Sequence, residues 1–570
     1  MPPPAKLLPT YYFLTTTYYF LPMNLARTLL RPVAFLAGRH AAGQVRTFLA
    51  AHKNTAAAQD RVLAELLAAH RGTAFGRDHG FEKIRNYADF ISAVPVRSYD
   101  ALKPYADRVF AGEFDALLPP GQRALMFSQT SGTTGQPKYV PVTSRFLAEM
   151  RRGWNIFGAR ALADHPEAWL RPLMTINSSM HESASPAGVP CGAISGLLAA
   201  TQKGIVRRMY VAPLQAADVA DPLAKYYTIL RCGVGRDVSI ITTANPSSTI
   251  KIIEVGQAHA EALIRDVADG TITPPGRLPP SLEGRLRFRR NAALARRMED
   301  GLRRDGQLLP RHFWNVSLLC NWTGGTLRLY QRRLRELFGE APIRDIGLLA
   351  SEGRFSVPLD DQTPAGVAEI TANFLEFIPA ADYGRDDPPT LRAHELEVGQ
   401  EYFLVISNWA GLWRYSIDDR VRVTGHFGRS PLFEFLSRGT RTSSITGEKI
   451  TEHQVVEAMR RAAAPLGAAI DRFCLRGRFA ATPYYELRIE PADGWSPEAI
   501  AEAMDRELAG LNVEYASKRH SGRLGCIRVS AVAPGHFERA ERHAIADRHG
   551  RSEQYKHQYL MTEVLDGEGD

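Results

Sequence analysis

The sequence has few cysteines and no long apolar run. Its five cysteines are odd in number and far apart, and no two have the spacing of a metal site or a redox pair. This usage fits a reducing cytosol and predicts a cytoplasmic protein. No apolar stretch reaches the length needed to span a bilayer, so we expect no stable membrane insertion.

The sequence also lacks the features of a nucleic-acid-binding protein. The formal net charge is +9, but arginines are mixed with acids throughout the chain. No recognition helix, zinc-finger spacing or stripe of alternating aromatic and basic residues is present. The charge pattern therefore indicates a solvated, arginine-rich surface and excludes a nucleic-acid partner.

The length and composition are those of a globular protein with more than one domain. At 570 residues the chain exceeds what one hydrophobic core normally supports, and 45% hydrophobic and 23% charged residues are ordinary values. Residues 1–22 combine prolines, aromatics and threonines without a clean apolar core or a small-residue cleavage site. We interpret them as a disordered extension and not as a signal peptide.

Helical and strand patterns alternate along the chain. The sequence predicts helices over Leu25–His70, Arg145–Asp164, Arg287–Arg304 and Leu327–Leu337, strands over Tyr402–Ser407 and Val421–Thr424, and a proline-rich surface loop over Thr273–Gly284. Beyond residue 435 the pattern changes to a compact α+β unit. It has helices from about Thr451 and over Pro497–Leu508, and strands near Phe473, near Tyr485 and over Cys526–Val532.

A Gly/Ser/Thr-rich turn separates the two parts of the chain. We expect an N-terminal domain over 23–434, a hinge over 435–447 and a C-terminal domain over 448–570. The glycine and hydroxyl content of this turn is what a hinge between moving domains needs.

The most informative segment is the nine-residue stretch TSGTTGQPK, which follows an apolar run. Its glycines let main-chain N–H groups approach an anion, its hydroxyls add donors, and Lys138 adds a point charge. Such clusters are often only solvated turns. Lysine, however, is scarce here, at 11 of the 70 basic residues. The pattern therefore predicts a phosphate-binding loop with the following members: Thr130, Ser131, Gly132, Thr133, Thr134, Gly135 and Lys138. The order resembles the phosphate loop of adenylate-forming enzymes.

Three further segments carry candidate site residues. Glu352 follows an apolar run beside Ser351, where an acid suits a Mg²⁺ that bridges polyphosphate, although such an acid is often only a cap or an ion-pair partner. Asp418 and Asp419 lie among aromatic and β-branched residues, where a carboxylate either accepts from ribose hydroxyls or is a buried structural acid. Lys449 lies at the start of the C-terminal unit.

Together these segments resemble the GH3 family of acyl-acid amido synthetases, a branch of the adenylate-forming superfamily. The resemblance covers nearly the whole chain after Met23. It includes the segments GTAFGRDHGF (72–81), VPVRSYDALKPY (94–105), NPSS (245–248), WTGG (322–325) and QYK (554–556).

The resemblance implies an α/β fold. It consists of a large N-terminal adenylate-forming domain with mixed β-sheets and flanking helices, and a smaller mobile C-terminal α+β domain. It also implies ATP and Mg²⁺ as cofactors, and small carboxylic acid and amine substrates, the amine usually that of an amino acid. The chemistry would be ligation through an acyl-adenylate with release of AMP.

The resemblance also assigns roles by position. The loop residues and Lys138 would bind phosphate, Glu352 would ligate Mg²⁺ or face the phosphate together with Ser351, and Asp419 would bind ribose. Lys449 and Lys556 would reach AMP during acyl transfer, when the small domain swings to admit the amine. Lys138, Glu352, Lys449 and Lys556 are therefore the expected catalytic residues, and Glu352 is the expected metal ligand.

Two positions depart from the family pattern. The family often has Tyr-x-Ser-Ser-Glu where this chain has Leu348 to Glu352, so the aromatic expected against adenine is missing. The family often has Arg-x-Gly-Asp where this chain has Asp418 in the place of glycine, which puts the local turn in question.

Three functions fit these residues. The first is the amido synthetase. The second is an acid–thiol (CoA) ligase, which shares the adenylation step and differs in the acceptor. The third is a nucleotide-binding homologue that has lost catalysis, an alternative supported by Leu348 and Asp418.

Overall fold

The computed structural model describes residues 38–130, 138–439, 442–443, 445–446, 448, 450–480, 482–492, 494–520, 524–546 and 557–566. Four sequence predictions lie outside these residues: the extension 1–22, the loop residues 131–135, Lys449 and Lys556.

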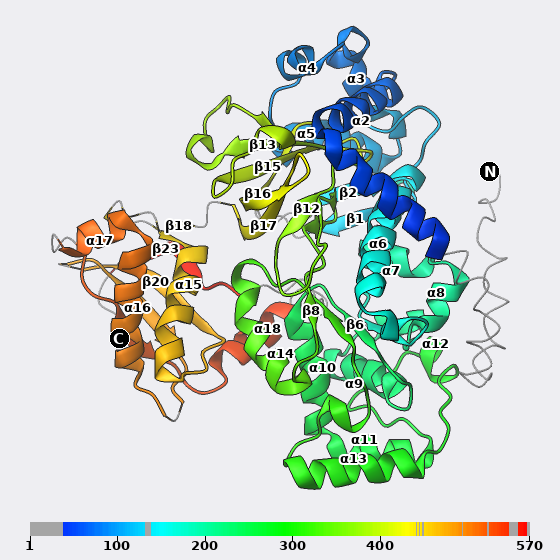
Figure 1. Ribbon diagram of the computed structural model, residues 1–570, viewed down its shortest axis with the longest axis vertical. Helices are drawn as coiled ribbons and strands as arrows, with labels where there is room; N and C mark the ends of the chain where they lie inside the picture. Colours follow the sequence, from blue (N-terminus) through cyan, green and yellow to red (C-terminus); the bar gives the residue numbers. More distant parts are fainter. Residues whose placement is uncertain are drawn as a thin grey trace.

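The described chain begins with helices that pack against one face of a large sheet (Figure 1). Residues 38–51 are helical, and α2 ends at His70, as predicted. The side chain of Asn54 caps α2 by accepting from the N–H of Ala57, and its apolar face buries Val62 and Leu66. The helices of this layer are α2 (Thr55–His70), α3 (Ala74–Asp78), α4 (Tyr87–Ala93) and α5 (Tyr99–Ala111).

A four-stranded sheet follows, in the order β2-β1-β5-β4. Its strands are β1 (Met126–Thr130), β2 (Lys138–Val142), β4 (Ser183–Ala184) and β5 (Pro190–Gly192). β1 is antiparallel to β2, with Thr130 opposite Lys138, and parallel to β5. The ladder thus holds the two ends of the predicted phosphate loop opposite each other. The following helices are α6 (Ser144–Asp164), which confirms the predicted helix, α7 (Ile194–Ala200) and α8 (Gly204–Met209).

A parallel sheet with its own core lies beside these helices. Its strands, in order, are β3 (Leu173–Thr175), β6 (Ile240–Thr242), β7 (Leu318–Cys320) and β8 (Ile343–Arg344). Figure 1 shows it surrounded by helices. They are α9 (Pro222–Gly233), α10 (Pro246–Ala258), α11 (Ala260–Asp269), α12 (Pro280–Glu283), α13 (Ala292–Asp305) and α14 (Tyr330–Phe338).

Local chemistry sets the bounds of three of these helices. In the NPSS segment, the side chain of Asn245 caps α10 and Pro246 takes the first helical position. The predicted helix over 287–304 begins later, at Ala292, because the side chain of Asn291 accepts from Leu294 N–H and caps α13 there. The predicted loop 273–284 was wrong at its end, since α12 forms one short helix after Pro279.

The largest sheet has seven strands, in the order β11-β12-β17-β16-β15-β13-β14. They are β11 (Ser356–Val357), β12 (Gly366–Ala368), β13 (Phe374–Pro379), β14 (Leu391–Arg392), β15 (Glu401–Ser407), β16 (Tyr415–Phe427) and β17 (Ser430–Arg438). A small hairpin, β9 (Leu349–Ala350) and β10 (Gly353–Arg354), precedes them. β16 is longer than the predicted strand over 421–424 because its polar ends pair with β15 and β17. β17 extends to Arg438 and therefore enters the predicted hinge, where Phe435, Ser437 and Arg438 pair with β16.

The C-terminal part is a compact α+β unit with a separate core, as predicted (left in Figure 1). Its sheet has the order β22-β21-β20-β23 and mixed strand directions. The elements are β18 (Thr442–Ser443), β19 (Ile450–Thr451), α15 (Glu452–Ala463), β20 (Phe473–Phe479), β21 (Tyr484–Ile489), α16 (Pro497–Leu511), α17 (Val513–His520), β22 (Arg528–Ala531), α18 (His536–Ala546) and β23 (Leu560–Asp566). Thr451 and Gln454 form a capping box for α15.

Short 3₁₀ helices connect many of these elements. They are η2 (His52–Asn54), η3 (Phe81–Lys83), η4 (Phe114–Ala116), η5 (Pro166–Ala168), η6 (Leu214–Asp218), η7 (Pro310–His312), η8 (Gly325–Leu329), η9 (Ala380–Asp382), η10 (Ala393–Glu395) and η11 (Ala464–Leu466). The helix predicted over 327–337 therefore consists of η8 followed by α14.

One helix from each part connects the C-terminal unit with the rest of the chain. Lys251 of α10 pairs with Glu538 of α18, with Nζ and Oε1 at 3.4 Å, and Figure 1 shows α18 beside α10 and α14. The predicted α/β fold is confirmed. Among the described residues, no helix has both the length and the apolarity of a membrane span.

Candidate active site

Lys138 lies at the start of β2, opposite Thr130, the last residue of β1. Its Nζ donates to the hydroxyl of Tyr415 at 3.3 Å and lies 5.4 Å from the centre of the Tyr99 ring. Burial, followed by smaller charge effects, raises the pKa of Tyr99 to about 12, so its phenol stays protonated near neutral pH. Lys138 therefore has neutral aromatic neighbours, which leave its charge available to an anion.

Glu352 lies in the turn between β9 and β10, beside the half-buried Ser351. Only 1% of Glu352 is exposed, and its Oε1 has no hydrogen-bond partner among the described residues. The nearest charge is Arg438, whose Nη2 lies 3.8 Å from Oε1. A buried carboxylate oxygen without a donor is costly, so this oxygen is suited to a cation or a further donor.

Asp419 lies on β16 and pairs in register with Arg438 at the end of β17. It is 4% exposed, and its Oδ1 lies 3.6 Å from Arg438 Nε. Burial alone would lower the pKa of Arg438, but the charges of Asp419 and Glu352 outweigh it and raise that pKa. Arg438 thus stays charged between the two carboxylates.

Tyr415 connects these groups. It is buried, and its hydroxyl accepts from Lys138. Burial raises its pKa, and the charge of Glu352 adds to the effect, while Arg438 opposes it. The structure therefore brings Lys138, Glu352 and Asp419 around one tyrosine and one arginine. Such an arrangement can bind a group that carries both phosphate and hydroxyls.

The WTGG segment supports the turn that carries Glu352. Trp322 Nε1 donates to the carbonyl of Gly347 at 2.8 Å, and the N–H and hydroxyl of Thr323 donate to Asp345 at 2.6 and 2.8 Å. Burial raises the pKa of Asp345 to about 6, although these donors oppose the shift. At Gly325, where φ is +58°, a Cβ would lie 2.8 Å from the carbonyl oxygen of Leu436. Glycine is needed there because the loop contacts the β17 backbone.

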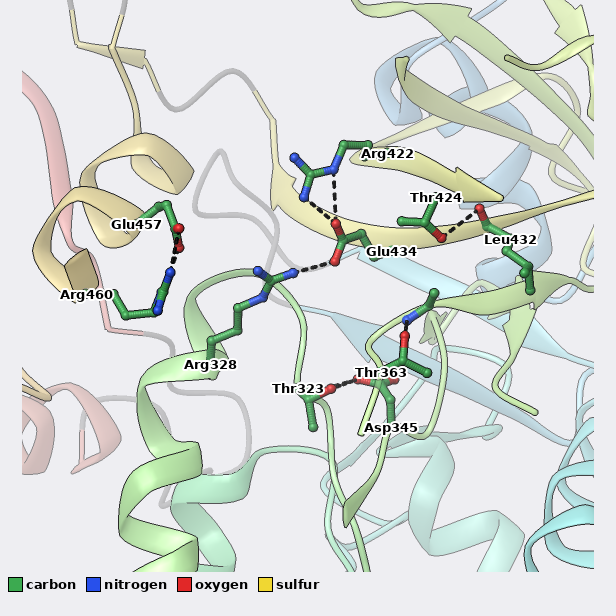
Figure 2. A network of polar contacts seen from close by, with 11 residues as sticks. Thr323, Arg328, Asp345, Thr363, Arg422, Thr424, Leu432, Glu434, Glu457 and Arg460 are labelled. Carbon is green, nitrogen blue, oxygen red and sulfur yellow. Dashed lines mark hydrogen bonds and ion pairs between the residues drawn. The ribbon is translucent and has the colours of Figure 1, made fainter. Parts of the chain in front are cut away.

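A charged network next to this segment fixes β17 (Figure 2). Glu434, 4% exposed, lies between Arg328 of η8 and Arg422 of β16 and accepts from both. Figure 2 shows Glu457 and Arg460, an ion pair on α15, on the other side of Arg328. Because η8, β16 and β17 each supply one member of this network, the network holds the three elements together beside the C-terminal unit.

Three residues of this site were not predicted from the sequence: Arg438, Tyr415 and Asp345. Arg438 follows an alternating strand pattern in the segment FLSRG, but the sequence does not show which acidic residue it pairs with. Tyr415 and Asp345 had no signal beyond their position near predicted acids. Leu348, where the family has an aromatic, packs half-buried against the main core. At Asp418 the turn survives, because its φ is +63°, in the left-handed region that glycine favours.

The described residues contain no group of three or more His, Cys, Asp or Glu side chains placed to hold a metal ion. A Mg²⁺ that binds with a polyphosphate needs only one or two carboxylates, because phosphate and water oxygens complete its shell. Glu352 Oε1, which is buried, accepts no hydrogen bond from the described residues and lies 3.8 Å from Arg438 Nη2, can serve as such a carboxylate oxygen.

Comparison with known proteins covers almost the whole chain. Residues 44–343 match the GH3 family N-terminal domain, 367–438 the central domain and 453–564 the C-terminal domain. The chain is 24% identical over 537 residues to a probable indole-3-acetic acid-amido synthetase of Oryza sativa subsp. japonica, covering 88% of this chain and 87% of the relative. It is 23% identical to the jasmonoyl–L-amino acid synthetase JAR6 of Nicotiana attenuata, covering 86% and 89%.

A solved structure has the same fold. The acyl acid amido synthetase AtGH3.15, in complex with 2,4-DB, superposes with a TM-score of 0.78 at 20% identity, covering 92% of this chain and 94% of that one. Since all three family domains match in order, and the first alone spans more than half of the chain, the protein belongs to the GH3 family.

Proposed function

We propose that the protein is an acyl-acid amido synthetase. It activates a small carboxylic acid with ATP as an acyl-adenylate and transfers the acyl group to the amine of an amino acid. The two relatives described above are a probable indole-3-acetic acid-amido synthetase and a jasmonoyl–L-amino acid synthetase. The observation that carries the proposal is the meeting of Lys138, Glu352 and Asp419 around Tyr415 and Arg438.

In this proposal the nucleotide lies between Lys138 and Asp419. The Asp419 carboxylate accepts from the ribose hydroxyls, as a charged acceptor does best. Residues 130–135 bind the phosphates through main-chain N–H groups and hydroxyls, and Lys138 adds a positive charge at the end of the loop. The neutral phenols of Tyr99 and Tyr415 keep that charge from being cancelled by a protein carboxylate.

Glu352 would hold Mg²⁺ through Oε1, the oxygen that accepts no hydrogen bond from the described residues, with Ser351 beside it. The ion, when bound, neutralises phosphate charge during adenylation. Arg438 lies between Glu352 and Asp419, and together with Lys138 it would supply positive charge near the phosphates.

The chemistry requires positioning and neutralisation rather than a nucleophile from the protein. A carboxylate must approach a polyanion, attack the α-phosphorus and expel pyrophosphate, so cations near the reacting oxygens lower the barrier. In the second step the amine attacks the acyl carbon, and AMP leaves. Lys449 and Lys556 lie beyond the link to the C-terminal unit and would reach AMP in that step.

The domain division follows the same logic. We propose that 23–434 form the adenylation domain and that 448–570 form a small domain that moves between the two steps. β17 ends at Arg438 on the large sheet, and β18 begins at Thr442 in the small domain, where it pairs with β19. We propose that the pivot lies within the predicted hinge, after Arg438 and before Thr442. The free thiols of all five cysteines support a cytoplasmic location.

A pyrophosphate-exchange screen tests the function. Acids of increasing size are incubated with ATP, Mg²⁺ and the full-length protein, and each active acid is then offered amino acids or CoA. We expect acid-dependent exchange and a product formed with an amino acid. A product formed only with CoA would mean an acid–thiol ligase, and no exchange with any acid would mean a homologue without adenylation activity.

A further inference from the structure

Asp418 lies in a bulge of the central sheet. Phe403 pairs with Arg420 and Val405 with Ser416, so residues 417–419 of β16 face the single residue Leu404 of β15. Asp418 has φ +63°, which residues with a Cβ adopt rarely and aspartate tolerates better than most. Bulges re-aim side chains next to active sites, and this one carries Asp419.

A tyrosine from another segment holds the Asp418 side chain. The hydroxyl of Tyr383, just after η9, donates to Asp418 Oδ1 at 2.5 Å, and the Ser416 hydroxyl lies at 3.5 Å from the same oxygen. The Tyr383 ring stacks on Phe403 of β15, with centroids 3.6 Å apart and planes at 19°. Tyr383 is therefore fixed to the strand opposite the bulge and reaches across to its strained residue.

The backbone of Asp418 is bonded to the start of the link between domains. Its carbonyl accepts from Gly439 N–H at 2.6 Å, directly after Arg438, the partner of Asp419. A change in the backbone at Asp418 would therefore move both the Asp419 carboxylate and the first residue of the link.

We propose that Tyr383 is a positioning residue: by holding Asp418 in the left-handed turn, it fixes the Asp419 carboxylate against the ribose and the link residue Gly439 against β16. This inference rests on the proposed function for its nucleotide. The pair replaces the glycine of the family pattern. Where glycine adopts this turn freely, Asp418 adopts it because its side chain is bonded.

A double-mutant cycle tests the coupling. The wild type, Tyr383→Phe, Asp418→Gly and the double variant are compared by the KM for ATP and for dATP in acid-dependent pyrophosphate exchange, and by thermal unfolding. Tyr383→Phe keeps the stacked ring and removes the hydroxyl. We expect it to reduce the preference for ATP over dATP about tenfold, the size of one charge-assisted hydrogen bond.

The same substitution in the Asp418→Gly background should change the preference less than about twofold, because the bond is already absent there and glycine needs no support. Asp418→Asn is the conservative variant. It keeps an acceptor for the tyrosine and tolerates the turn, so it should retain most of the preference.

Other outcomes overturn the inference. An equal loss in both backgrounds would mean that Tyr383 acts on the nucleotide directly. A lower unfolding midpoint with an unchanged ATP preference would mean a purely structural bond. If the wild type shows no exchange with any acid, the proposed function fails instead, and the unfolding midpoints decide the pairing: effects of the two substitutions that simply add would overturn it.

Discussion

Lys138 and Asp419 mark the two limits of the candidate site, and the fold forms their surroundings in different ways. Thr130 and Lys138 are register partners on consecutive strands, so the loop between them is a continuous stretch of sequence. Asp419 instead meets Arg438 across β16 and β17, and Glu352 arrives from a separate hairpin. A phosphate loop needs contiguous main-chain N–H groups, whereas a group of charges can be collected from any segments that the fold brings together.

The difference also concerns what holds each part. Among the described residues, Lys138 contacts two tyrosines and has no carboxylate within ion-pair distance. The other part is a compensated charge group, with Arg438 between two acids and Glu434 between two further arginines. Substitution at Lys138 should therefore affect chemistry alone, while substitution in the charge group should affect both chemistry and stability.

The largest effect is expected at Lys138. Lys138→Ala should lower acid-dependent pyrophosphate exchange about 10²–10³-fold, because one preorganised charge near the reacting phosphate is lost. The unfolding midpoint should stay unchanged, since the side chain is only half-buried and fills no core position. Lys83→Ala is the matched control, because Lys83 is exposed and lies far from Lys138 in the sequence. Exchange within a fewfold of wild type would remove Lys138 from the site.

Glu352→Gln tests the charge group. We expect about a hundredfold slower exchange, together with a higher Mg²⁺ concentration for half-maximal rate, because the neutral amide binds the ion weakly. Glu434→Gln is the control, since Glu434 is a similarly buried acid that lies on β17 between two arginines. It should lower the unfolding midpoint without moving the Mg²⁺ dependence. The same Mg²⁺ dependence for wild type and Glu352→Gln would contradict the metal role.

The contrast also explains what the sequence could predict. Lys138, Glu352 and Asp419 could be proposed as site residues because each lies in a short, ordered motif near an apolar or strand-like run. Arg438 and Tyr383 were not found, because their importance depends on pairing between strands and on a bulge that no local pattern marks. The helices of the C-terminal unit could be predicted because their patterns are local, and the structure shows that they carry their own caps, such as Thr451 with Gln454 and Ser496 before Pro497.

Asp419→Asn should have a smaller effect, specific to the ribose. The loss of a charge-assisted hydrogen bond costs about 1.5–3 kcal/mol, so the KM for ATP should rise roughly 10- to 150-fold and that for dATP much less. Asp505→Asn is the control: this acid pairs with Arg519 in the C-terminal unit, and its loss should change stability only. Equal losses for ATP and dATP would identify Asp419 as a structural acid.

The smallest effect is expected at the link between the domains, where a substitution can be compared with a matched one inside the small domain. Gly439 has φ +68° with open space around it, and Gly467, in the small domain, has φ +61° with equally open space. Alanine at either position should therefore cost about 1 kcal/mol of stability through backbone strain alone. A proline at 439 would remove the N–H that donates to Asp418 and could not reach a positive φ, so alanine is the cleaner change.

If the small domain pivots at 439–441, the two variants should differ in the rates of the two half-reactions. Gly439→Ala should slow capture of the acyl-adenylate by the amine several-fold and leave its formation nearly unchanged, because strain at the pivot acts on the rotation and not on the adenylation geometry. Gly467→Ala should leave both steps unchanged at the same loss of stability. Rapid-quench measurement of each step on the two folded variants decides between the possibilities. Equal slowing of both steps by Gly439→Ala, or the same pattern in Gly467→Ala, would place the pivot elsewhere or show that transfer needs none.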